Sequence, residues 1–247
     1  MDTALYVSLA HRSALKRKMD VVAHNIANMN TTAFKKEQVM FKEFLMDAPG
    51  TVSGKITSVI DYGVSRTMTE GTIVHTGNEL DIFISGKAYL SVEGKDGEPY
   101  YTRNGRMTLD QEGFLTLLSG EKVLDIDGAP IQFEEGETGI VIADDGTLSA
   151  ATPEGVSEEK AKLGFKQFEN EQNMKRVGTS LYKTDEEGEE ADDFTIRQKS
   201  IESSNVNPIE EITKMITIQR AYESSGRSNS KYEEMRTDSL KRLAKVQ

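Results

Sequence analysis

Three histidines, His11, His24 and His75, are the side chains of this chain best suited to bind a transition metal or to transfer protons near neutral pH. A zinc site requires several His, Cys or carboxylate ligands at short, regular spacings, as in the HExxH pattern. The chain has no cysteine, and its histidines share no such spacing. We therefore expect the histidines to be scattered surface or interface residues, with no metal and no catalytic role.

The acidic run DEEGEEADD at residues 185–193 offers carboxylates that calcium prefers as ligands. It lacks the ordered alternation of an EF-hand loop, so we interpret it as a solvated loop, and we interpret Asp125, Asp127 and Gly128 as a hairpin turn. No GxxxxGK[ST] phosphate loop and no GxSxG nucleophile elbow occur. The sequence thus predicts no catalytic, metal-binding or cofactor-binding residue, and the protein is not expected to be an enzyme.

Composition excludes several classes of partner. The formal net charge of -11 over 247 residues provides no concentrated basic surface for nucleic acid or anionic lipid. No segment reaches the roughly 18 uninterrupted apolar residues of a membrane span, so direct membrane insertion is not expected. After the basic cluster at residues 16–18, His24 and Asn25 interrupt a short apolar run, which argues against a cleaved signal peptide.

The chain begins with a predicted helix over about residues 2–28. Its apolar residues recur at helical spacing and define one face: Leu5, Leu15, Met19, Val22 and Ile26. The cluster NMNTT at residues 28–32 follows, and its short polar side chains compete with the helix for backbone hydrogen bonds. We expect the helix to end there and the chain to change direction.

A second predicted helix begins near residue 207. Asn207 is a good N-cap, Pro208 suits the first helical position, and Glu210 stands where a capping box places its carboxylate. Apolar residues then repeat at helical spacing and resume after a weak point at residues 224–226, Ser-Ser-Gly. The pattern predicts either two helices with a hinge or one kinked helix.

Between the helices the periodicity changes from helical to alternating. Pairs such as Ile82 and Ile84, Met107 and Leu109, and Leu115 and Leu117 mark strands separated by glycine-containing turns. The predicted fold class is α+β, with terminal helices and a central antiparallel all-β domain. The expected organisation is an N-terminal helix at 1–34, a connecting arm at 35–60, the β domain at 61–197 and a C-terminal helical segment at 198–247.

Four segments carry a family resemblance, in the same order as in that family: NIANMNTTAFK, NELDIFISGKAYLSV, YYTRNGRMTLDQEGFL and SNVNPIEEITKMITIQRAYE. The chain resembles the axial proteins of the bacterial flagellum, the family of rod and hook subunits. Its length, its MDTALYVSL opening and its single middle domain most resemble the proximal rod subunits. The family usually has a glycine where Ala33 stands, so a turn with positive φ would cost this chain conformational energy.

The resemblance implies a structural subunit of the basal-body rod that transmits torque along the axial drive shaft. It implies an inner coiled-coil layer made by the terminal helices, an outer layer made by the β domain, and a helical assembly with other rod subunits. It further implies passage through the flagellar export apparatus without a cleaved signal, to a periplasmic rod that could contact peptidoglycan.

The residues expected at subunit interfaces lie on the two terminal helices and beside them. Asn205 and Asn207 fit capping or turn roles as well as they fit a direct contact between subunits. A glutamine on an apolar seam and an arginine near a tyrosine favour contacts between subunits. The complete set is Leu5, Leu15, Met19, Val22, Asn25, Ile26, Asn28, Asn30, Asn205, Asn207, Ile209, Ile212, Met215, Ile216, Gln219, Arg220 and Tyr222.

Three alternatives stay open at the level of sequence. Fold and terminal motifs are shared across the family, so a distal rod subunit or a short hook-like protein is the first. The second is a β domain that binds or cleaves peptidoglycan, although no paired carboxylates or zinc ligands support cleavage. The third is a soluble coiled-coil adapter, which would form a closed oligomer of fixed size.

Overall fold

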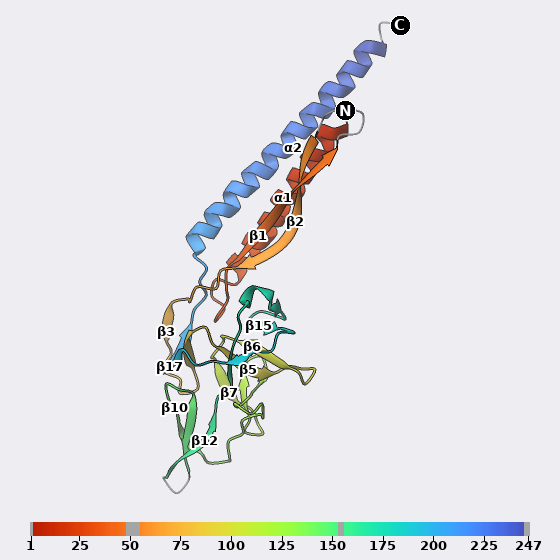
Figure 1. Cartoon of the computed structure of the whole chain (residues 1–247). Helices are drawn as coiled ribbons and strands as arrows, with labels where there is room; N and C mark the ends of the chain where they lie inside the picture. Colours follow the sequence, from red (N-terminus) through yellow and green to blue (C-terminus); the bar gives the residue numbers. More distant parts are fainter. Residues whose placement is uncertain (1, 48–54, 153–155, 245–247) are drawn as a thin grey trace. The chain divides into compact units, whose positions relative to one another are not determined.

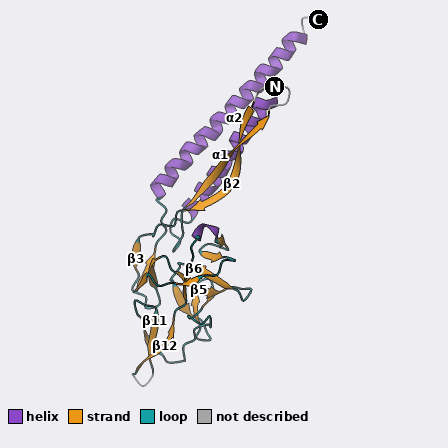
Figure 2. Cartoon of the chain, in the orientation of Figure 1, coloured by secondary structure: helices purple, strands orange, loops and turns teal. Residues whose placement is uncertain are grey.

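The computed structural model describes residues 2–47, 55–152 and 156–244, and it divides the chain into two compact units (Figure 1). The helical unit comprises residues 1–27, 37–67 and 207–247, and the β unit comprises residues 28–36 and 68–206. Figure 2 shows that helix dominates one unit and strand the other. The chain therefore passes between the units four times, after residues 27, 36, 67 and 206.

The helical unit contains α1 (Asp2–Ala27), α2 (Pro208–Ala244) and a hairpin of β1 (Glu37–Asp47) and β2 (Lys55–Arg66). Helix α1 contacts both α2 and the hairpin. Leu15, Val21 and Val22 are buried in this packing. Because α1 has neighbours on two sides, these side chains are covered within one chain, while Val7 and Leu9 nearer its start stay exposed.

The segment after α1 follows the sequence prediction. The helix ends at Ala27, and Asn28 begins a turn in which its carbonyl accepts a hydrogen bond from Thr31 N at 3.1 Å. Ala33 has a φ of 56°, and its N–H donates to the carbonyl of Glu202 at 2.9 Å. The left-handed conformation costs an L-residue about 1–2 kcal/mol, so this bond and the burial of Ala33 must offset that cost.

The start of α2 also follows the prediction. Oδ1 of Asn207 accepts hydrogen bonds from the backbone N–H of Ile209 at 3.1 Å and of Glu210 at 3.4 Å, and Pro208 is the first helical residue. An N-cap side chain satisfies N–H groups that have no partner inside the helix.

Asn207→Ala is expected to destabilise α2 by about 1 kcal/mol because those N–H groups lose their acceptor. Urea titration of the helical circular dichroism signal measures the effect. Asn207→Ser is the matched control and should stay close to wild type, since serine caps as well as asparagine does. Equal losses in both variants would contradict the capping role.

The predicted hinge at residues 224–226 is wrong. Helix α2 continues unbroken through Ser224, Ser225 and Gly226 to Ala244. A single helical glycine costs only about 1 kcal/mol relative to alanine, which is too little to interrupt a long run of hydrogen bonds. The carbonyl of Gly226 also accepts a hydrogen bond from Ser230 Oγ at 3.2 Å, one turn further along the helix.

Residues 35–60 were expected to form a connecting arm, and the structure shows most of this segment in the β1–β2 hairpin. The strands pair antiparallel from Glu37 with Arg66 to Asp47 with Lys55, with one register shift between Met40 and Phe41. Strand β2 also extends beyond residue 60 to Arg66, so residues 61–67 belong to the helical unit. Glycines and one proline in residues 48–54 interrupted the sequence pattern, and these residues lie outside the described part.

The β unit is built from short strands and one 3₁₀ turn at Glu171–Asn173, and every strand pair in the described residues is antiparallel. The strands are β3 (Ile73–His75), β4 (Ile82–Gly86), β5 (Tyr89–Glu93), β6 (Pro99–Thr102), β7 (Met107–Leu109), β8 (Leu115–Leu117), β9 (Lys122–Val123), β10 (Thr138–Ile142), β11 (Thr147–Ala151), β12 (Ser157–Lys162), β13 (Phe165–Gln167), β14 (Lys175–Arg176), β15 (Leu181–Lys183), β16 (Glu189–Glu190), β17 (Phe194–Gln198) and β18 (Ser200–Glu202). The largest sheet has the order β14-β15-β6-β5-β9-β8-β7, with β13 pairing with β5 and β16.

The core of the β unit confirms most of the alternation in the sequence. Ile82, Ile84, Leu115 and Leu117 are buried in one cluster, but Leu109 is 36% exposed because it ends β7. A smaller cluster joins Tyr89, Phe168, Met174 and Tyr182, with edge-to-face ring contacts. These two clusters hold short strands that could not be stable singly.

Two further segments differ from the sequence expectation. Residues 198–206, expected in the C-terminal helical segment, include β18 and belong to the β unit. The acidic run at 185–193, expected as a loop, contains β16, which pairs with β13. Both strands are too short for periodicity to reveal, and their partners are distant in sequence.

Candidate functional site

The apolar seam predicted on α1 is mostly covered within the chain. Leu15 and Val22 are buried, and Met19 and Ile26 are half-buried. The side chain of Leu5 lies outside the described part of the structure. The face that the sequence offered for contacts between subunits thus packs against the chain's own helix and hairpin.

Asn25 is buried at the point where α1, α2 and β1 meet. Its amide group donates to the carbonyl of Glu37 at 2.9 Å and to Oε2 of Glu211 at 3.1 Å, and its Oδ1 accepts from Glu37 N at 3.0 Å. Glu211 is also buried and accepts a bond from Lys214 Nζ at 2.8 Å. Asn25, expected at a subunit interface, therefore joins two helices of the same chain.

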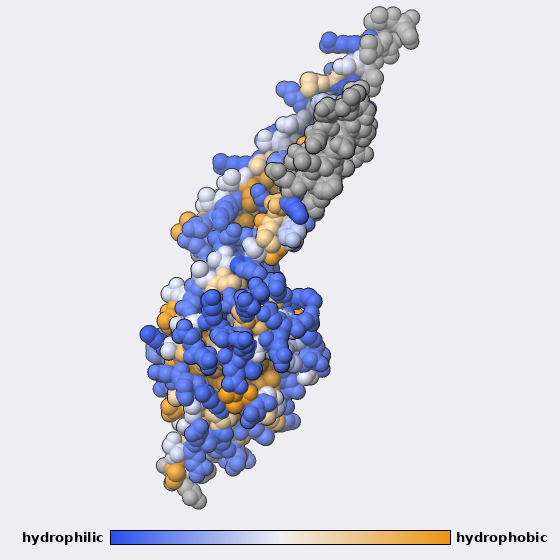
Figure 3. Space-filling view, in the orientation of Figure 1, coloured by the Kyte–Doolittle hydropathy of each residue, from blue (hydrophilic) through white to orange (hydrophobic). Residues whose placement is uncertain are grey.

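Helix α2 carries large apolar side chains on the face opposite to α1. Ile209, Ile212 and Ile216 are 78%, 47% and 47% exposed. Glu211 and Tyr222, eleven residues or about three turns apart, mark the face that packs on α1. Met215, half-buried, lies between them, so the predicted α2 residues divide into an inward face and an exposed apolar row. Figure 3 shows scattered hydrophobic patches on the mostly hydrophilic surface of the molecule.

The polar residues predicted further along α2 have local partners or are exposed. The hydroxyl of Tyr222 accepts a bond from Arg12 Nη2 at 3.2 Å, and the guanidinium lies 4.9 Å from the ring centre. Nε2 of Gln219 donates to Glu223 Oε1 at 3.3 Å within the helix. Arg220 is exposed beside the isoleucine row.

The remaining predicted asparagines lie at the ends of elements. Asn28 and Asn207 form the turn and the cap described above, and Asn30 is exposed. Asn205 is half-buried, and its Oδ1 accepts from Lys36 N at 2.7 Å while its amide group donates to the carbonyl of Thr69 at 2.9 Å. The capping alternative thus accounts for Asn207, whereas the side chain of Asn205 joins segments of the chain that are distant in sequence.

Sequence reasoning missed a buried ionic cluster in the β unit, formed by Lys35, Arg103 and Glu202. Glu202 Oε1 lies 2.6 Å from Lys35 Nζ, and Glu202 Oε2 lies 2.9 Å from Arg103 Nε. All three side chains are at most 5% exposed. Arg103 also donates to three strand carbonyls, those of Ile84, Gly86 and Ala88.

This cluster joins three parts of the chain that are far apart in sequence. Lys35 belongs to the segment leaving α1, Arg103 follows β6, and Glu202 ends β18 before the segment that leads to α2. The backbone N–H of Gly71 donates to Glu202 Oε1 at 2.8 Å and completes the carboxylate's partners. The cluster therefore joins the short 28–36 segment of the β unit to its last strand, β18.

The charges of the cluster depend on each other. Burial alone would raise the pKa of Glu202, but Arg103, Lys35 and the N–H of Gly71 outweigh it and hold the pKa below its ordinary value. Burial lowers the pKa of Lys35, although Glu202 acts in the opposite direction. Lys35 and Arg103 thus flank Glu202, and Glu70 Oε1 also lies 3.6 Å from Arg103 Nη2.

Because its pKa is lower in the folded state than in the unfolded state, Glu202 adds stability above the unfolded value of about 4.3. That stability is expected to be lost as the pH falls below this value through the folded pKa. Urea titrations between pH 3 and pH 7 on the wild type and on Glu202→Gln measure the difference in slope. Identical slopes would contradict this account of Glu202.

The described residues contain no group of three or more His, Cys, Asp or Glu side chains that could hold a metal ion. His24 Nδ1 lies 3.3 Å from Glu37 Oε2, and His75 Nδ1 lies 3.4 Å from Ser200 Oγ. Neither α1 nor α2, over its described residues, has the length of apolar sequence that a membrane span requires.

Three family models match separate parts of the chain. The model described as "Flagella basal body rod protein" matches residues 6–35, that of the "Flagellar hook protein FlgE/F/G D1 domain" matches 83–150, and that of the "Flagellar basal body rod FlgEFG protein C-terminal" matches 197–242. The first covers most of α1, the second covers β-unit core strands, and the third covers β18 and most of α2.

Similar proteins extend over the full length. "Flagellar basal-body rod protein FlgF" of Caulobacter vibrioides is 35% identical over 250 residues, covering 100% of both chains. The protein of the same name from Rhizobium meliloti is 33% identical over 90% of each chain. The chain belongs to the flagellar basal-body rod protein family. "Flagellar basal-body rod protein FlgG" of Bacillus subtilis is also similar, with 31% identity over 92% of this chain and 94% of its own.

For a rod-family protein, the candidate functional site is the exposed surface of the helical unit. Its most apolar exposed part in the described residues of α2 is the isoleucine row, opposite a face that the chain covers itself. Such a row fits binding to another protein rather than catalysis, since it offers no titratable group.

Proposed function

We propose that this protein is a structural subunit of the proximal rod of the flagellar basal body and transmits torque from the rotor to more distal axial segments. The observation that carries the proposal is the exposed row Ile209, Ile212 and Ile216 on a helix of a rod-family chain. Soluble monomers seldom leave aligned large aliphatic side chains in water, and such rows mark binding surfaces.

The gain from covering this row is substantial. Fully burying an isoleucine contributes about 1.5–3 kcal/mol, so covering three side chains that are 78%, 47% and 47% exposed would contribute on the order of 3–5 kcal/mol. A rod subunit has many neighbours, and several contacts of this size would resist twisting of the assembly.

In the proposed arrangement the terminal helices of neighbouring subunits form an inner coiled-coil layer, and the β units form the outer layer. Contacts that join different surfaces of successive subunits do not close and so build a helical tube. The partners are other proximal and distal rod proteins. The chain would reach the periplasmic rod through the flagellar export apparatus, without a cleaved signal peptide.

Gene deletion tests this function directly. Cells lacking the gene, and cells producing a chain truncated after Asn207, should not swim and should lack hooks and filaments by electron microscopy, while earlier rod subunits are still exported. Normal flagella in the deletion strain would refute the rod assignment. Normal flagella in the truncation strain alone would refute the role of α2.

A distal rod position is the alternative within the family, because proteins named FlgG are also similar over most of the chain. The two positions differ in stoichiometry and in place along the rod. Labelling the chain in isolated basal bodies would separate them.

A cleft in the β unit favours peptidoglycan contact as a second candidate function. It has a volume of about 790 Å³ and is lined largely by hydroxyl and amide side chains, among them Asn30, Asn104 and Thr179. Such side chains suit the hydroxyl and amide groups of a glycan. Cosedimentation of the purified protein with isolated cell walls tests this, and Asn104→Ala with Thr179→Val should reduce the bound fraction.

A further inference from the structure

The cleft in the β unit contains charged groups in addition to its hydroxyl and amide side chains. Three charged residues line it: Glu121, which is only 7% exposed, and Lys95 and Arg106, which are exposed. Within the part of the chain that the structure describes, none of these three side chains forms an ion pair. The cleft therefore holds a carboxylate and two cations that do not neutralise one another.

The turn between β8 and β9 positions Glu121. The backbone N–H of Leu117 donates to the carbonyl of Glu121 at 2.8 Å, and that of Gly120 donates to the carbonyl of Leu117 at 2.9 Å. Gly120 has a φ of 97°, which glycine adopts without steric cost. Oε2 of Glu121 accepts a hydrogen bond from Ser119 Oγ, while Oε1 has no partner among the described residues. A carboxylate that is largely removed from water gains from a further donor, and most of all from a cation.

The two cations of the cleft come from other turns of the β unit. Lys95 lies in the turn between β5 and β6, where the adjacent Asp96 is already paired with Lys183 Nζ at 2.9 Å and accepts a hydrogen bond from the Tyr100 hydroxyl at 3.2 Å. Arg106 directly precedes β7, and its guanidinium contacts no carboxylate of the described residues. Both cations thus remain available to an anionic group of a ligand.

The size of the cleft limits the kind of ligand. Its volume of about 790 Å³ lies in the range of sites for small ligands, roughly 300–1,000 Å³. Leu118 and Val177, 60% and 38% exposed, add apolar surface to its lining. A ligand that matches the whole cleft is therefore small and zwitterionic. It offers amide or hydroxyl groups to the neutral side chains, an ammonium group to Glu121 and a carboxylate to Arg106.

We propose that this cleft binds the peptide stem of a peptidoglycan fragment, with an ammonium group of the stem on Glu121 and a carboxylate of the stem on Arg106. The inference rests on the second candidate function, peptidoglycan contact, and names the part of the polymer that is recognised. A stem that is not cross-linked is a short peptide with the free amine of its diamino acid and with free carboxylates. The acetylated glycan backbone carries no ammonium, and cross-linking converts the stem amine into an uncharged amide.

Titration calorimetry of the purified full-length chain tests the proposal with three soluble probes released from cell walls. They are a disaccharide with its peptide stem, the same fragment with the stem amine acetylated, and the disaccharide without peptide. The wild type should bind the first probe. Acetylation should weaken binding by about tenfold or more, because it removes the charge-assisted bond to Glu121, and the disaccharide alone should bind more weakly than the first probe.

Variants of the chain test each contact separately. Glu121→Gln keeps the shape of the side chain and an acceptor for Ser119, and it should bind the intact fragment about tenfold more weakly while it binds the acetylated fragment as the wild type does. Arg106→Gln, at an exposed position, should also bind the intact fragment more weakly. Glu112→Gln is the matched control, because Glu112 is an exposed glutamate of the β unit outside the cleft, and it should bind like the wild type.

Circular dichroism establishes that each variant is folded, and acetylation of the probe and Arg106→Gln decide the outcome if Glu121→Gln does not fold. Equal affinity of the wild type for the intact and acetylated fragments would overturn the proposal, as would unchanged binding by folded Glu121→Gln or by Arg106→Gln. In those cases, cosedimentation of the wild type with cell walls would leave peptidoglycan contact standing. Neither cosedimentation nor binding to any fragment would instead refute the second candidate function itself.

Discussion

Replacing Glu202 by glutamine is expected to lower the free energy of unfolding of the β unit by about 3–5 kcal/mol. The substitution keeps the shape of the side chain but removes the buried carboxylate of the cluster. Lys35 and Arg103 then lose their closest counter-charge, which leaves the partly exposed Glu70 carboxylate 3.6 Å from Arg103 Nη2. The loss is large because burial prevents water from replacing the carboxylate.

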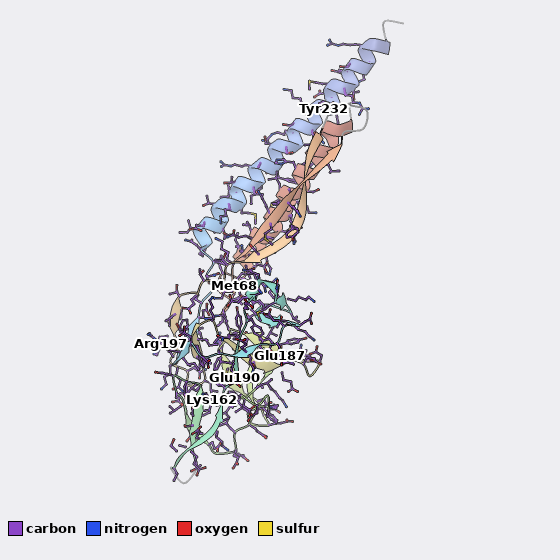
Figure 4. The ribbon with its side chains drawn as sticks, viewed as in Figure 1. Met68, Lys162, Glu187, Glu190, Arg197 and Tyr232 are labelled. Carbon is purple, nitrogen blue, oxygen red and sulfur yellow. The ribbon has the colours of Figure 1, made fainter. Side chains whose placement is uncertain are left out.

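Urea titration of the full chain, followed by tyrosine fluorescence, measures this effect, since Tyr89 and Tyr182 are buried in the β unit and the chain has no tryptophan. Glu190→Gln is the matched control, because Glu190 is an exposed residue of β16 (Figure 4). A loss below about 1 kcal/mol in Glu202→Gln, the range of an exposed ion pair, would refute the structural role of the cluster.

The second large effect is expected from charges placed in the isoleucine row. A chain with Ile212→Asp and Ile216→Asp should fold normally, because both side chains are half exposed, yet it should fail to restore swimming in the deletion strain. Packing against another subunit would bury two unpaired carboxylates, and that cost exceeds the gain from the remaining contacts.

Val141→Asp provides the matched control, since Val141 is a comparably exposed apolar side chain, 55% exposed, in strand β10 of the β unit. Circular dichroism of the purified variants establishes that each is folded. Full swimming by the Ile212→Asp and Ile216→Asp chain would show that the row is not an interface.

Much of the fold could be predicted from local sequence. The cap at Asn207 and the end of α1 before Asn28 use side chains that act on their own backbone, so their effect does not depend on distant residues. The alternation of Ile82 with Ile84 and of Leu115 with Leu117 indicated buried strands for the same reason. The hinge predicted at Gly226 was wrong because the low helix propensity of one glycine is small compared with the stability of the whole helix.

The contacts between residues distant in sequence could not be predicted. Nothing near residue 202 indicates that Glu202 meets Lys35 and Arg103, because these contacts span 167 and 99 residues of sequence. The sequence does indicate that the three residues matter singly, since each lies within or beside a segment that carried the family resemblance. Charged residues inside such segments, next to apolar ones, are candidates for buried pairs.

The sequence predicted interface residues on α2 without separating the two faces of that helix. Helical periodicity placed Met215 and Tyr222 in one group with Ile212 and Ile216. The packing of α1 separates them, because Met215 and Tyr222 face inward while the two isoleucines are exposed. A helix that is apolar on two sides gives one broad pattern in sequence. Which side faces the chain itself is decided by tertiary contacts such as that of Asn25 with Glu211.

The most direct test of the central claim is electron cryomicroscopy of isolated basal bodies at a resolution that identifies side chains in the rod. We predict density for this chain in the rod, with Ile209, Ile212 and Ile216 buried against a neighbouring subunit in an inner helical layer. A rod without this chain, or one in which the row faces solvent, would contradict the account.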